Sequence, residues 1–440
     1  MKISGFRGPY LVKINSSSPL GPNGVAAVGE GVLVVSSPTL VRVYKLASPI
    51  SGRIAPIPLC NPGQSLFLTC MDSVFDQNPS SPTFGQFLDA RIMGLSLDSV
   101  GSVVDSAGLT YDPAANTWNC FGGVPSPTPG CEYNAFPTGV SCVGKDDFWY
   151  GARPAGSWFC VGFLGLVWHY SSGAWSAPMN PPNPFHWLAP GFNSLTMVRG
   201  VPGPITGWAS FMDTTTNRPS VSWFDGFNWQ DSVPAIEPCS MGSCNEGFQK
   251  MSIPYGDPNH GWAVTGEYLL AYLDTTMPSP LPPAPGTWIA PAGQGSGYPV
   301  YWGVYMKSSS DVWACGNTPS NVPVIAHTTA PYPTIPIPIT IPAAPGNSGN
   351  PWLYPALMDI AFNSVAPNKG IAVGGPMSPG TPAGTPPLVY VTTDGGNTWT
   401  FVPITVPPTL TDPVLYHVRF VSPTKAYAIG YGHMLVEVNL

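Results

Sequence analysis

The stretch that decides the fold lies near the C-terminus, where KGIAVGG (Lys369 to Gly375) precedes VYVTTDGGNTW (Val389 to Trp399). The first segment consists of the apolar and small residues that suit a short buried strand. The second runs from a β-rich strand through Asp, Gly and Asn, which accept tight-turn geometries, into a tryptophan. The pair therefore predicts two strands followed by a hairpin whose return strand begins at Trp399.

Weaker copies of both segments recur along the chain at a spacing of about 50–60 residues, a period typical of repeat architectures. The first recurs as ARIMGLS (Ala90 to Ser96), DDFWYG (Asp146 to Gly151), TGWAS (Thr206 to Ser210), HGWAVTG (His260 to Gly266), DVWACG (Asp311 to Gly316) and KAYAIG (Lys425 to Gly430). The second recurs in segments that end at Trp118, Trp175, Trp229 and, in eroded form, Trp288. Each unit thus predicts an antiparallel meander of strand, strand, turn and Trp-led strand.

The hairpin itself matches a known pattern. Its Thr392, Asp394, Gly396, Thr398 and Trp399 fit S/T-x-D-x-G-x-T-W at every fixed position. This resembles the Asp box, or BNR repeat, of sialidase-like and photosystem-assembly-factor-like β-propellers, and the resemblance implies a propeller fold. We interpret the box as structural: the aspartate accepts N–H bonds across the turn, the glycines supply positive φ, and the tryptophan packs between blades.

We predict that residues 1–440 form a single all-β propeller of eight four-stranded antiparallel blades, with seven as the alternative. The count of eight includes a short first unit, Val25 to Pro58. The last unit, 411–440, stops one strand short, and residues 9–15 (PYLVKIN) are predicted to supply that strand and close the ring. Proline runs such as IPIPITIP (335–342) are predicted on outer edge strands, where a missing N–H is tolerated.

The composition narrows the class of partner. Only 9% of the residues are charged, the net charge is −7, and the 16 Lys and Arg are scattered, so we expect no nucleic-acid partner. No apolar run is long enough to span a bilayer. The N-terminal MKISGFRGPYLVKIN lacks the apolar core of a signal peptide. We expect a mature chain, a protein that leaves the cell without such a signal, or one that stays inside.

The nine cysteines fall into four local pairs and one single residue. We predict the disulfides Cys60–Cys70, Cys120–Cys131, Cys142–Cys160 and Cys239–Cys244, with Cys315 free. Such a pattern favours an oxidising compartment. Free buried thiols are the competing interpretation, and no Cys or His spacing indicates a zinc site.

The sequence contains no convincing catalytic set. Sialidases, one family that the resemblance implies, bind the substrate carboxylate with three arginines. In this chain only Arg199 and Arg419 fall near predicted innermost strands. Most other glycosidases need two opposed carboxylates. Asp146, Asp147, Asp311 and Asp359 lie near strand ends, where we interpret them as turn caps. The six histidines are dispersed, and we predict no metal and no cofactor.

Three aromatic residues lie outside the recurring positions and are the candidate ligand-binding residues. Trp187, Trp302 and Trp352 sit among Pro, Tyr and Phe in PFHWLAP, YPVYWGVY and NPWLYP. Aromatic rings on polar loops suit stacking on sugars, although packing is the competing interpretation for each.

Two classes of function follow. The first is a non-catalytic propeller on an extracellular or virion surface, which attaches to a host or neighbouring surface through a glycan or a protein. Long Pro-, Gly- and Thr-rich loops on a rigid scaffold favour it, since recognition usually resides on such loops. The alternative is a glycoside hydrolase of sialidase-like fold.

Overall fold

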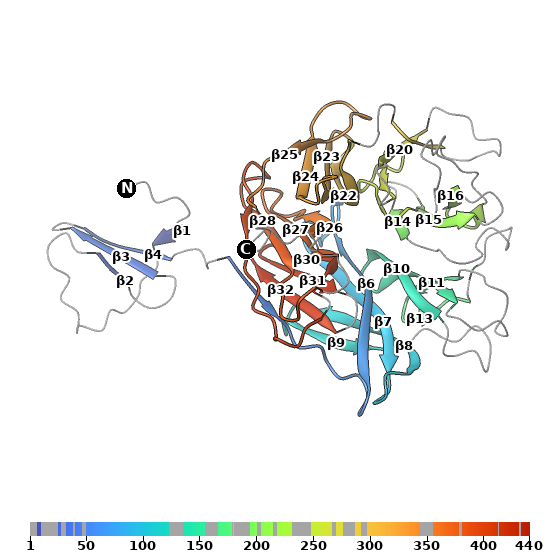
Figure 1. The fold of residues 1–440 in the computed structure, drawn as a ribbon, viewed down its shortest axis with the longest axis horizontal. Helices are drawn as coiled ribbons and strands as arrows, with labels where there is room; N and C mark the ends of the chain where they lie inside the picture. The colour runs from blue at the N-terminus through green and yellow to red at the C-terminus, as the bar shows by residue number, and fades with distance from the viewer. Residues whose placement is uncertain are drawn as a thin grey trace. The chain divides into compact units, whose positions relative to one another are not determined.

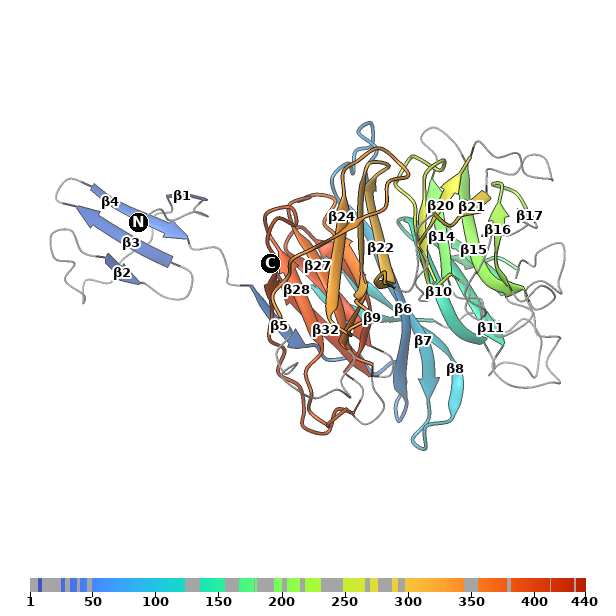
Figure 2. The same ribbon diagram turned by 45° about the horizontal axis from the view of Figure 1, so that its top comes forward.

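The repeats fold into four-stranded antiparallel sheets whose strands neighbour one another in chain order. In a computed structural model, seven such sheets stand as blades around a ring (Figure 1, Figure 2), each with its first strand innermost. The chain is therefore a β-propeller. The preferred count of eight blades was wrong, and the stated alternative of seven is confirmed. The described residues contain no helix that could cross a membrane.

The structure describes residues 7–9, 25–27, 32–37, 40–45, 50–122, 135–154, 166–177, 179, 194–199, 204–213, 218–230, 248–265, 270–275, 287–291, 297–343, 355–377, 381–411, 413–430 and 433–440.

The first four blades each use four consecutive strands. Blade 1 comprises β6 (Ser65–Phe75), β7 (Phe87–Leu97), β8 (Val103–Asp112) and β9 (Thr117–Phe121). Blade 2 comprises β10 (Ala135–Gly144), β11 (Asp147–Pro154), β12 (Leu166–Ser171) and β13 (Ala174–Trp175). Blade 3 comprises β14 (Ser194–Arg199), β15 (Ile205–Asp213), β16 (Arg218–Phe224) and β17 (Trp229–Gln230). Blade 4 comprises β18 (Lys250–Ser252), β19 (Trp262–Val264), β20 (Leu270–Asp274) and β21 (Thr287–Ile289).

The next two blades repeat this order, and the last one borrows a strand from the N-terminal side. Blade 5 comprises β22 (Val300–Ser308), β23 (Asp311–Asn317), β24 (Pro323–Thr328) and β25 (Ile337–Ile339). Blade 6 comprises β26 (Pro355–Phe362), β27 (Gly370–Pro376), β28 (Leu388–Thr392) and β29 (Thr400–Phe401). Blade 7 comprises β30 (Leu415–Ser422), β31 (Lys425–Gly430), β32 (Met434–Asn439) and β5 (Ser51–Ile54). The proline-rich β25 is an outer strand, as predicted.

The hydrophobic core lies between blades rather than within one centre. Separate buried clusters join neighbouring blades, and the recurring tryptophans take part in them. Trp313 of blade 5, for example, packs with Phe362 and Trp399 of blade 6. The tryptophan that recurs in each unit is thus a packing residue at most seams, as the sequence indicated.

The hairpin 392–399 has the predicted chemistry. Asp394 accepts hydrogen bonds from the Thr398 amide at 2.9 Å and from the Thr398 hydroxyl at 2.6 Å, and these bonds lower its pKa to about 2. Gly395 and Gly396 adopt φ of 81° and 98°. A Cβ on Gly396 would also meet the Trp313 ring at 2.0 Å, so the neighbouring blade requires glycine there.

The first part of the chain forms a separate compact unit, residues 1–51 with 439–440, rather than a blade of the ring. Its sheet has the order β1 (Arg7–Pro9), β4 (Leu40–Lys45), β3 (Val32–Ser37) and β2 (Val25–Ala27), which is not the meander order of the blades. The prediction that Val25 to Pro58 forms a short first blade was therefore wrong, because alternation alone does not say which sheet a strand joins.

The ring closes through an N-terminal segment, but not through the predicted one. The fourth strand of blade 7 is β5, and the Ala55 amide extends the pairing by a 2.7 Å bond to the Leu435 carbonyl. Of the predicted closing strand, residue 9 ends β1, which pairs with β4, and residues 10–15 lie outside the described residues. The prolines that follow β5 are also compatible with an outer edge, where a missing backbone N–H is tolerated.

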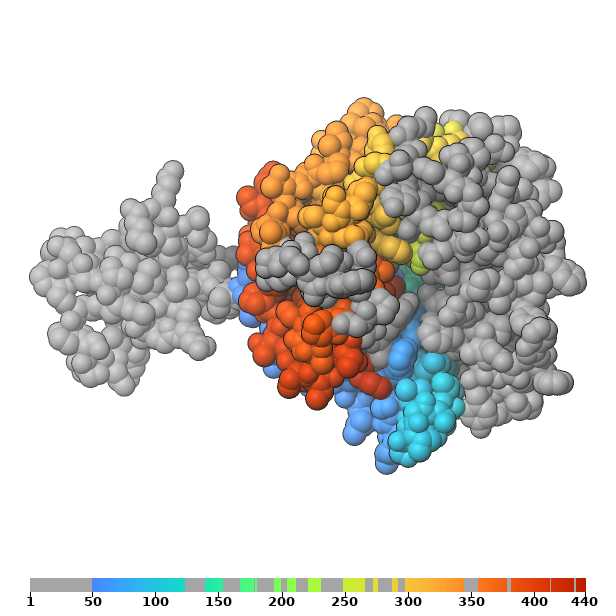
Figure 3. Space-filling view, in the orientation of Figure 1, coloured from blue at the N-terminus to red at the C-terminus, as the bar shows by residue number. Residues whose placement is uncertain are grey.

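A disulfide reinforces this closure. Figure 3 shows the blue and cyan surface of blade 1 beside the red surface of blade 7. The segment after β5 passes from blade 7 to blade 1, and its Cys60 is bonded to Cys120 of β9. The seam also holds a buried cluster that includes Ala55, Trp118 and Tyr427. The ring is thus locked covalently where its first and last blades meet.

The predicted pairs of Cys60 and Cys120 were therefore wrong. Cys70 lies within β6, and the extended chain carries it far from Cys60, so closeness in sequence does not become closeness in space. Cys70 and Cys142 are free and buried, which excludes Cys60–Cys70 and Cys142–Cys160. Cys315 is also free and buried. Cys131, Cys160, Cys239 and Cys244 lie outside the described residues.

Truncation distinguishes the two units. Deleting residues 1–45 should leave the unfolding midpoint of the ring unchanged, because β1 to β4 belong to the other unit. Deleting residues 1–58 also removes β5 and should cost on the order of 2–4 kcal/mol and promote aggregation, because an edge of blade 7 loses its partner. Urea unfolding and light scattering of both truncations measure this. Equal stability of the two would contradict the assignment of β5.

Reduction should loosen the ring at its seam. The disulfide closes a loop of 60 residues, so its loss should lower the free energy of unfolding by about 4 kcal/mol in the chain-entropy description. The Cys60→Ser/Cys120→Ser variant should show this loss in the free energy of unfolding, and adding a reductant should not change its stability further. The Cys315→Ala control should remain sensitive to reductant. Non-reducing peptide mapping that links Cys60 to Cys70 would refute the Cys60–Cys120 disulfide.

Candidate functional site

The innermost strands of all seven blades surround a cavity of about 220 Å³. Its walls include residues of β6, β10, β14, β18, β22, β26 and β30, and it extends to Gln77 and Tyr255 in the loops that follow β6 and β18. Because every blade contributes, the cavity lies in the central channel of the ring. Small-molecule sites in proteins are usually concave and largely preformed spaces of this kind.

Side chains of one blade bind the backbone of the next around this channel. Asp72, Ser141 and Ser252 occupy equivalent positions, each paired in register with a residue of the recurring first motif. Each accepts a backbone N–H from the following blade at 2.9 Å: Cys142, Met197 and Met306, respectively. These bonds satisfy amides on the strand edge that faces the channel. We call them the inter-blade latches.

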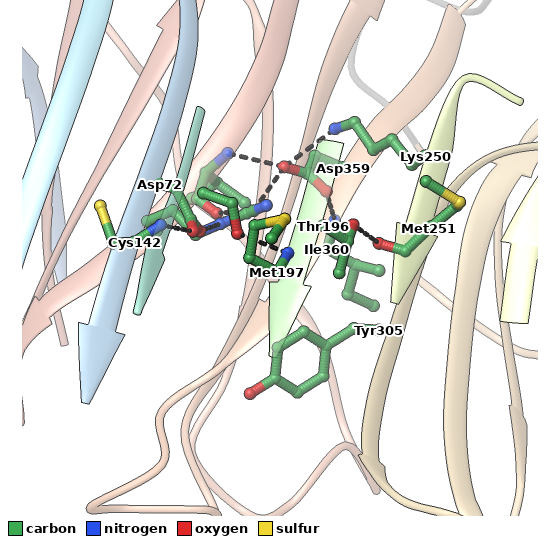
Figure 4. A network of polar contacts seen from close by, with 12 residues as sticks. Asp72, Cys142, Thr196, Met197, Lys250, Met251, Tyr305, Asp359 and Ile360 are labelled. Carbon is green, nitrogen blue, oxygen red and sulfur yellow. Dashed lines mark hydrogen bonds and ion pairs between the residues drawn. The ribbon is translucent and has the colours of Figure 1, made fainter. Parts of the chain in front are cut away.

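The fourth latch belongs to a network of charges. Asp359 of β26 accepts the Val418 amide of blade 7 at 2.9 Å. The same carboxylate oxygen lies 2.9 Å from Lys250 Nζ and 2.9 Å from Arg419 Nη1. Arg419 Nε in turn donates to Asp72 at 2.9 Å, and Figure 4 labels Asp72, Asp359 and Lys250 of this network. Two carboxylates and two cations from blades 1, 4, 6 and 7 therefore balance one another in the channel.

Burial governs the ionisation of this channel network. It raises the pKa of Asp72, which Arg419 opposes only in part. Asp359 is also buried, but the positive charges of Lys250 and Arg419 outweigh that effect and hold its pKa below the usual value. Burial lowers the pKa of Lys250 to about 8, and the pKa of His417 falls well below its usual value through burial and Lys250. His417 is therefore neutral at pH 7.

Of the four aspartates predicted to cap turns, three lie at or next to strand ends and one lies within a strand. Asp146, with φ of 52°, lies in the β10–β11 turn and pairs with Arg91 at 2.7 Å. Asp147 and Asp311 begin strands, as expected. Asp359 was interpreted wrongly: it lies inside β26, where a bulge between Leu357 and Asp359 shifts the register. Sequence does not reveal such a bulge, so the side chain's access to the channel was not foreseen.

Two histidines complete a repeated packing unit. Asp147 Oδ1 accepts a hydrogen bond from His169 Nε2 at 2.8 Å, and that ring stacks on Trp149 with centroids 4.3 Å apart. Asp311, His327 and Trp313 repeat the arrangement in blade 5. Of the other histidines, His260 pairs with Asp257 and His433 bonds the Leu66 carbonyl, while His186 lies outside the described residues.

The structure locates only one of the three candidate tryptophans. Trp302 is half-buried, donates its indole N–H to Asn317 at 3.0 Å and packs against a cluster that contains Met358 and Val414. Trp187 and Trp352 lie outside the described residues. A ligand-binding role for these three residues remains a prediction. Arg199 ends β14 and Arg419 lies in β30, both innermost strands, as the sequence indicated.

Sequence reasoning missed Asp72 and Lys250. Asp72 lies opposite Arg91 of ARIMGLS in the strand ladder, the same place that Ser141 and Ser252 take opposite tryptophans. Aligning the strand before each motif would have revealed a row of side chains facing the channel. Which of them meet across the ring depends on pairing between distant blades.

Known proteins share this fold at low sequence identity. No protein-family profile and no curated protein matches the chain. Among solved structures, YCF48 from Cyanidioschyzon merolae is 13% identical with a TM-score of 0.51, over 88% of this chain and 99% of that chain. The GH74 xyloglucanase from Xanthomonas campestris is 14% identical with a TM-score of 0.54, over 88% of this chain. The match spans 53% of the xyloglucanase chain. These likenesses establish the propeller fold alone.

Removing the carboxylate at the centre of the network should destabilise the ring. Asp359→Asn leaves Lys250 and Arg419 facing each other in a buried place, so we expect a loss of about 3–5 kcal/mol in urea unfolding. The matched control is Asp257→Asn, whose contact with the His260 ring is partly exposed and should be worth less than about 1 kcal/mol. Equal effects of the two substitutions would show that the channel network is not structural.

Proposed function

We propose that this propeller is a non-catalytic binding protein that serves as a structural or attachment component at an extracellular or virion surface. Its partner in this proposal is a host or neighbouring surface, recognised through a glycan or a protein. The ring supplies a rigid scaffold, and recognition belongs to its channel cavity and its loops.

One observation carries the non-catalytic part of the proposal. Of the described residues that line the cavity, the only charged ones are Asp72 and Arg419, and they bind each other. The second channel carboxylate, Asp359, is 2% exposed and already bound to two cations and two backbone amides. Glycoside hydrolysis by the usual route needs two carboxyl groups that reach opposite sides of one bond. Asp72 and Asp359 instead form bonds that hold neighbouring blades together.

The proposed location at an extracellular or virion surface rests on the disulfide and the composition. Cys60–Cys120 bridges the seam of the ring, and stable disulfides are typical of secreted or surface-exposed proteins. With 9% charged residues, recognition would depend on shape, aromatic contact and hydrogen bonds. Binding of that kind loses little strength when salt screens charges.

A turnover assay tests the class. The intact protein is incubated with neutral and sialylated oligosaccharides, and released reducing ends are measured. We expect no turnover by the parent, and the same result for Asp72→Asn. Hydrolysis that Asp72→Asn abolishes, in a variant with unchanged circular dichroism, would make the protein a glycosidase and overturn the proposal.

A further inference from the structure

The channel cavity has the chemistry of a small, preformed ligand site. On the side of blade 1, Phe75 and Phe87 present a tilted pair of rings with centroids 5.3 Å apart. Tyr255 follows β18 of blade 4, and Tyr305 lies on β22 of blade 5. Blades 4 and 5 stand across the ring from blade 1 (Figure 1), so aromatic side chains line the cavity from two sides. Aromatic rings at such positions offer flat apolar surfaces to a ligand.

Between these rings the cavity is polar. Asp72 keeps 18% and Arg419 26% of their side chains accessible, although each is bound to the other. Half-buried hydroxyl side chains stand on the neighbouring strands and loops: Ser73, Thr196, Ser252 and Ser364. Carboxylate, guanidinium and hydroxyl groups together provide both acceptors and donors within one small space.

The rim of the cavity is held in place before any ligand arrives. The loop between β6 and β7 is tied by Asp76, which accepts the Asn78 amide at 3.0 Å and the Thr83 hydroxyl at 2.6 Å. Gln77 of this loop and Phe87, which directly follows it, line the cavity. A preformed rim lowers the ordering cost of binding.

Charge and size select the ligand. An anion would be repelled by Asp72 and a cation by Arg419, so the lining favours a neutral group. A hydrocarbon side chain would shield the accessible parts of the carboxylate, guanidinium and hydroxyl groups from water without offering them a hydrogen bond. A volume of about 220 Å³ is smaller than the roughly 300–1,000 Å³ of sites for drug-sized ligands, so only one ring of a larger molecule fits.

We propose that the channel cavity binds one neutral sugar residue of a glycan, with its ring between the aromatic walls and its hydroxyls bonded to Asp72, Arg419 and the serine and threonine side chains. This inference rests on the proposed binding function and names the ligand class for it. A single residue in a site of this size should bind with roughly millimolar affinity, so strength would come from many copies on a surface.

Saturation-transfer NMR with the intact protein tests the site. The probes are oligosaccharides that end in glucose, galactose, mannose or N-acetylglucosamine, and sialylated forms of the same chains. We expect saturation of a neutral terminal residue and none when sialic acid caps it. Phe87→Ala should weaken the signal at least about tenfold, because one aromatic wall is lost. The control Phe84→Ala, in the loop just before Phe87 but 54% exposed and outside the cavity lining, should change it less than about twofold.

A second variant covers the case in which Phe87→Ala fails to fold. Ser364→Trp places a large ring in the cavity from its rim without removing a core side chain, and we expect it to abolish sugar binding. Equal binding of sialylated probes, or binding that survives Ser364→Trp, overturns the inference. Attachment to a surface without any sugar binding overturns this inference but not the proposed function, whereas hydrolysis of the probes overturns the proposed function.

Discussion

The innermost strand of each blade has one edge that pairs with no other strand, and the backbone amides along this edge need partners. In this ring the neighbouring blade supplies them: Asp72, Ser141, Ser252 and Asp359 each accept one amide from the next blade. A buried amide without a partner would cost about 1–3 kcal/mol, so these short side chains fix both the register and the spacing of adjacent blades. The cavity has its shape because these bonds hold its walls.

Charges in the channel follow from the same constraint. A carboxylate is a stronger acceptor than a hydroxyl, but burial makes it costly unless cations accompany it. Lys250 and Arg419 do so for Asp359, and Arg419 also neutralises Asp72. A chain with so few charged residues thus concentrates four of them at its centre. What remains accessible in the cavity is the paired carboxylate and guanidinium of Asp72 and Arg419, and the proposed sugar site depends on this pair.

Sequence predicted what is local. The hairpin from Thr392 to Trp399, the buried tryptophans and the proline-rich outer strands all follow from turn chemistry and strand periodicity within one unit. The sequence did not decide what depends on contact between units: it left seven and eight blades open, and it did not predict the closing strand β5, the Cys60–Cys120 bond or the channel network. Asp72 and Arg419, for example, are 347 positions apart and meet only because the ring closes. Asp359 contacts Arg419 at a bulge in β26 that the residue pattern does not predict.

Amide hydrogen exchange resolved by NMR tests the central claim, that side chains of one blade satisfy the channel-facing amides of the next. The account predicts that the amides of Cys142, Met197, Met306 and Val418 exchange only on global unfolding, although they lie on unpaired strand edges beside a cavity. It also predicts that Ser141→Ala accelerates exchange at Met197 far more than at Met306. Exchange of all four amides in the parent as fast as in exposed hairpin turns would contradict it.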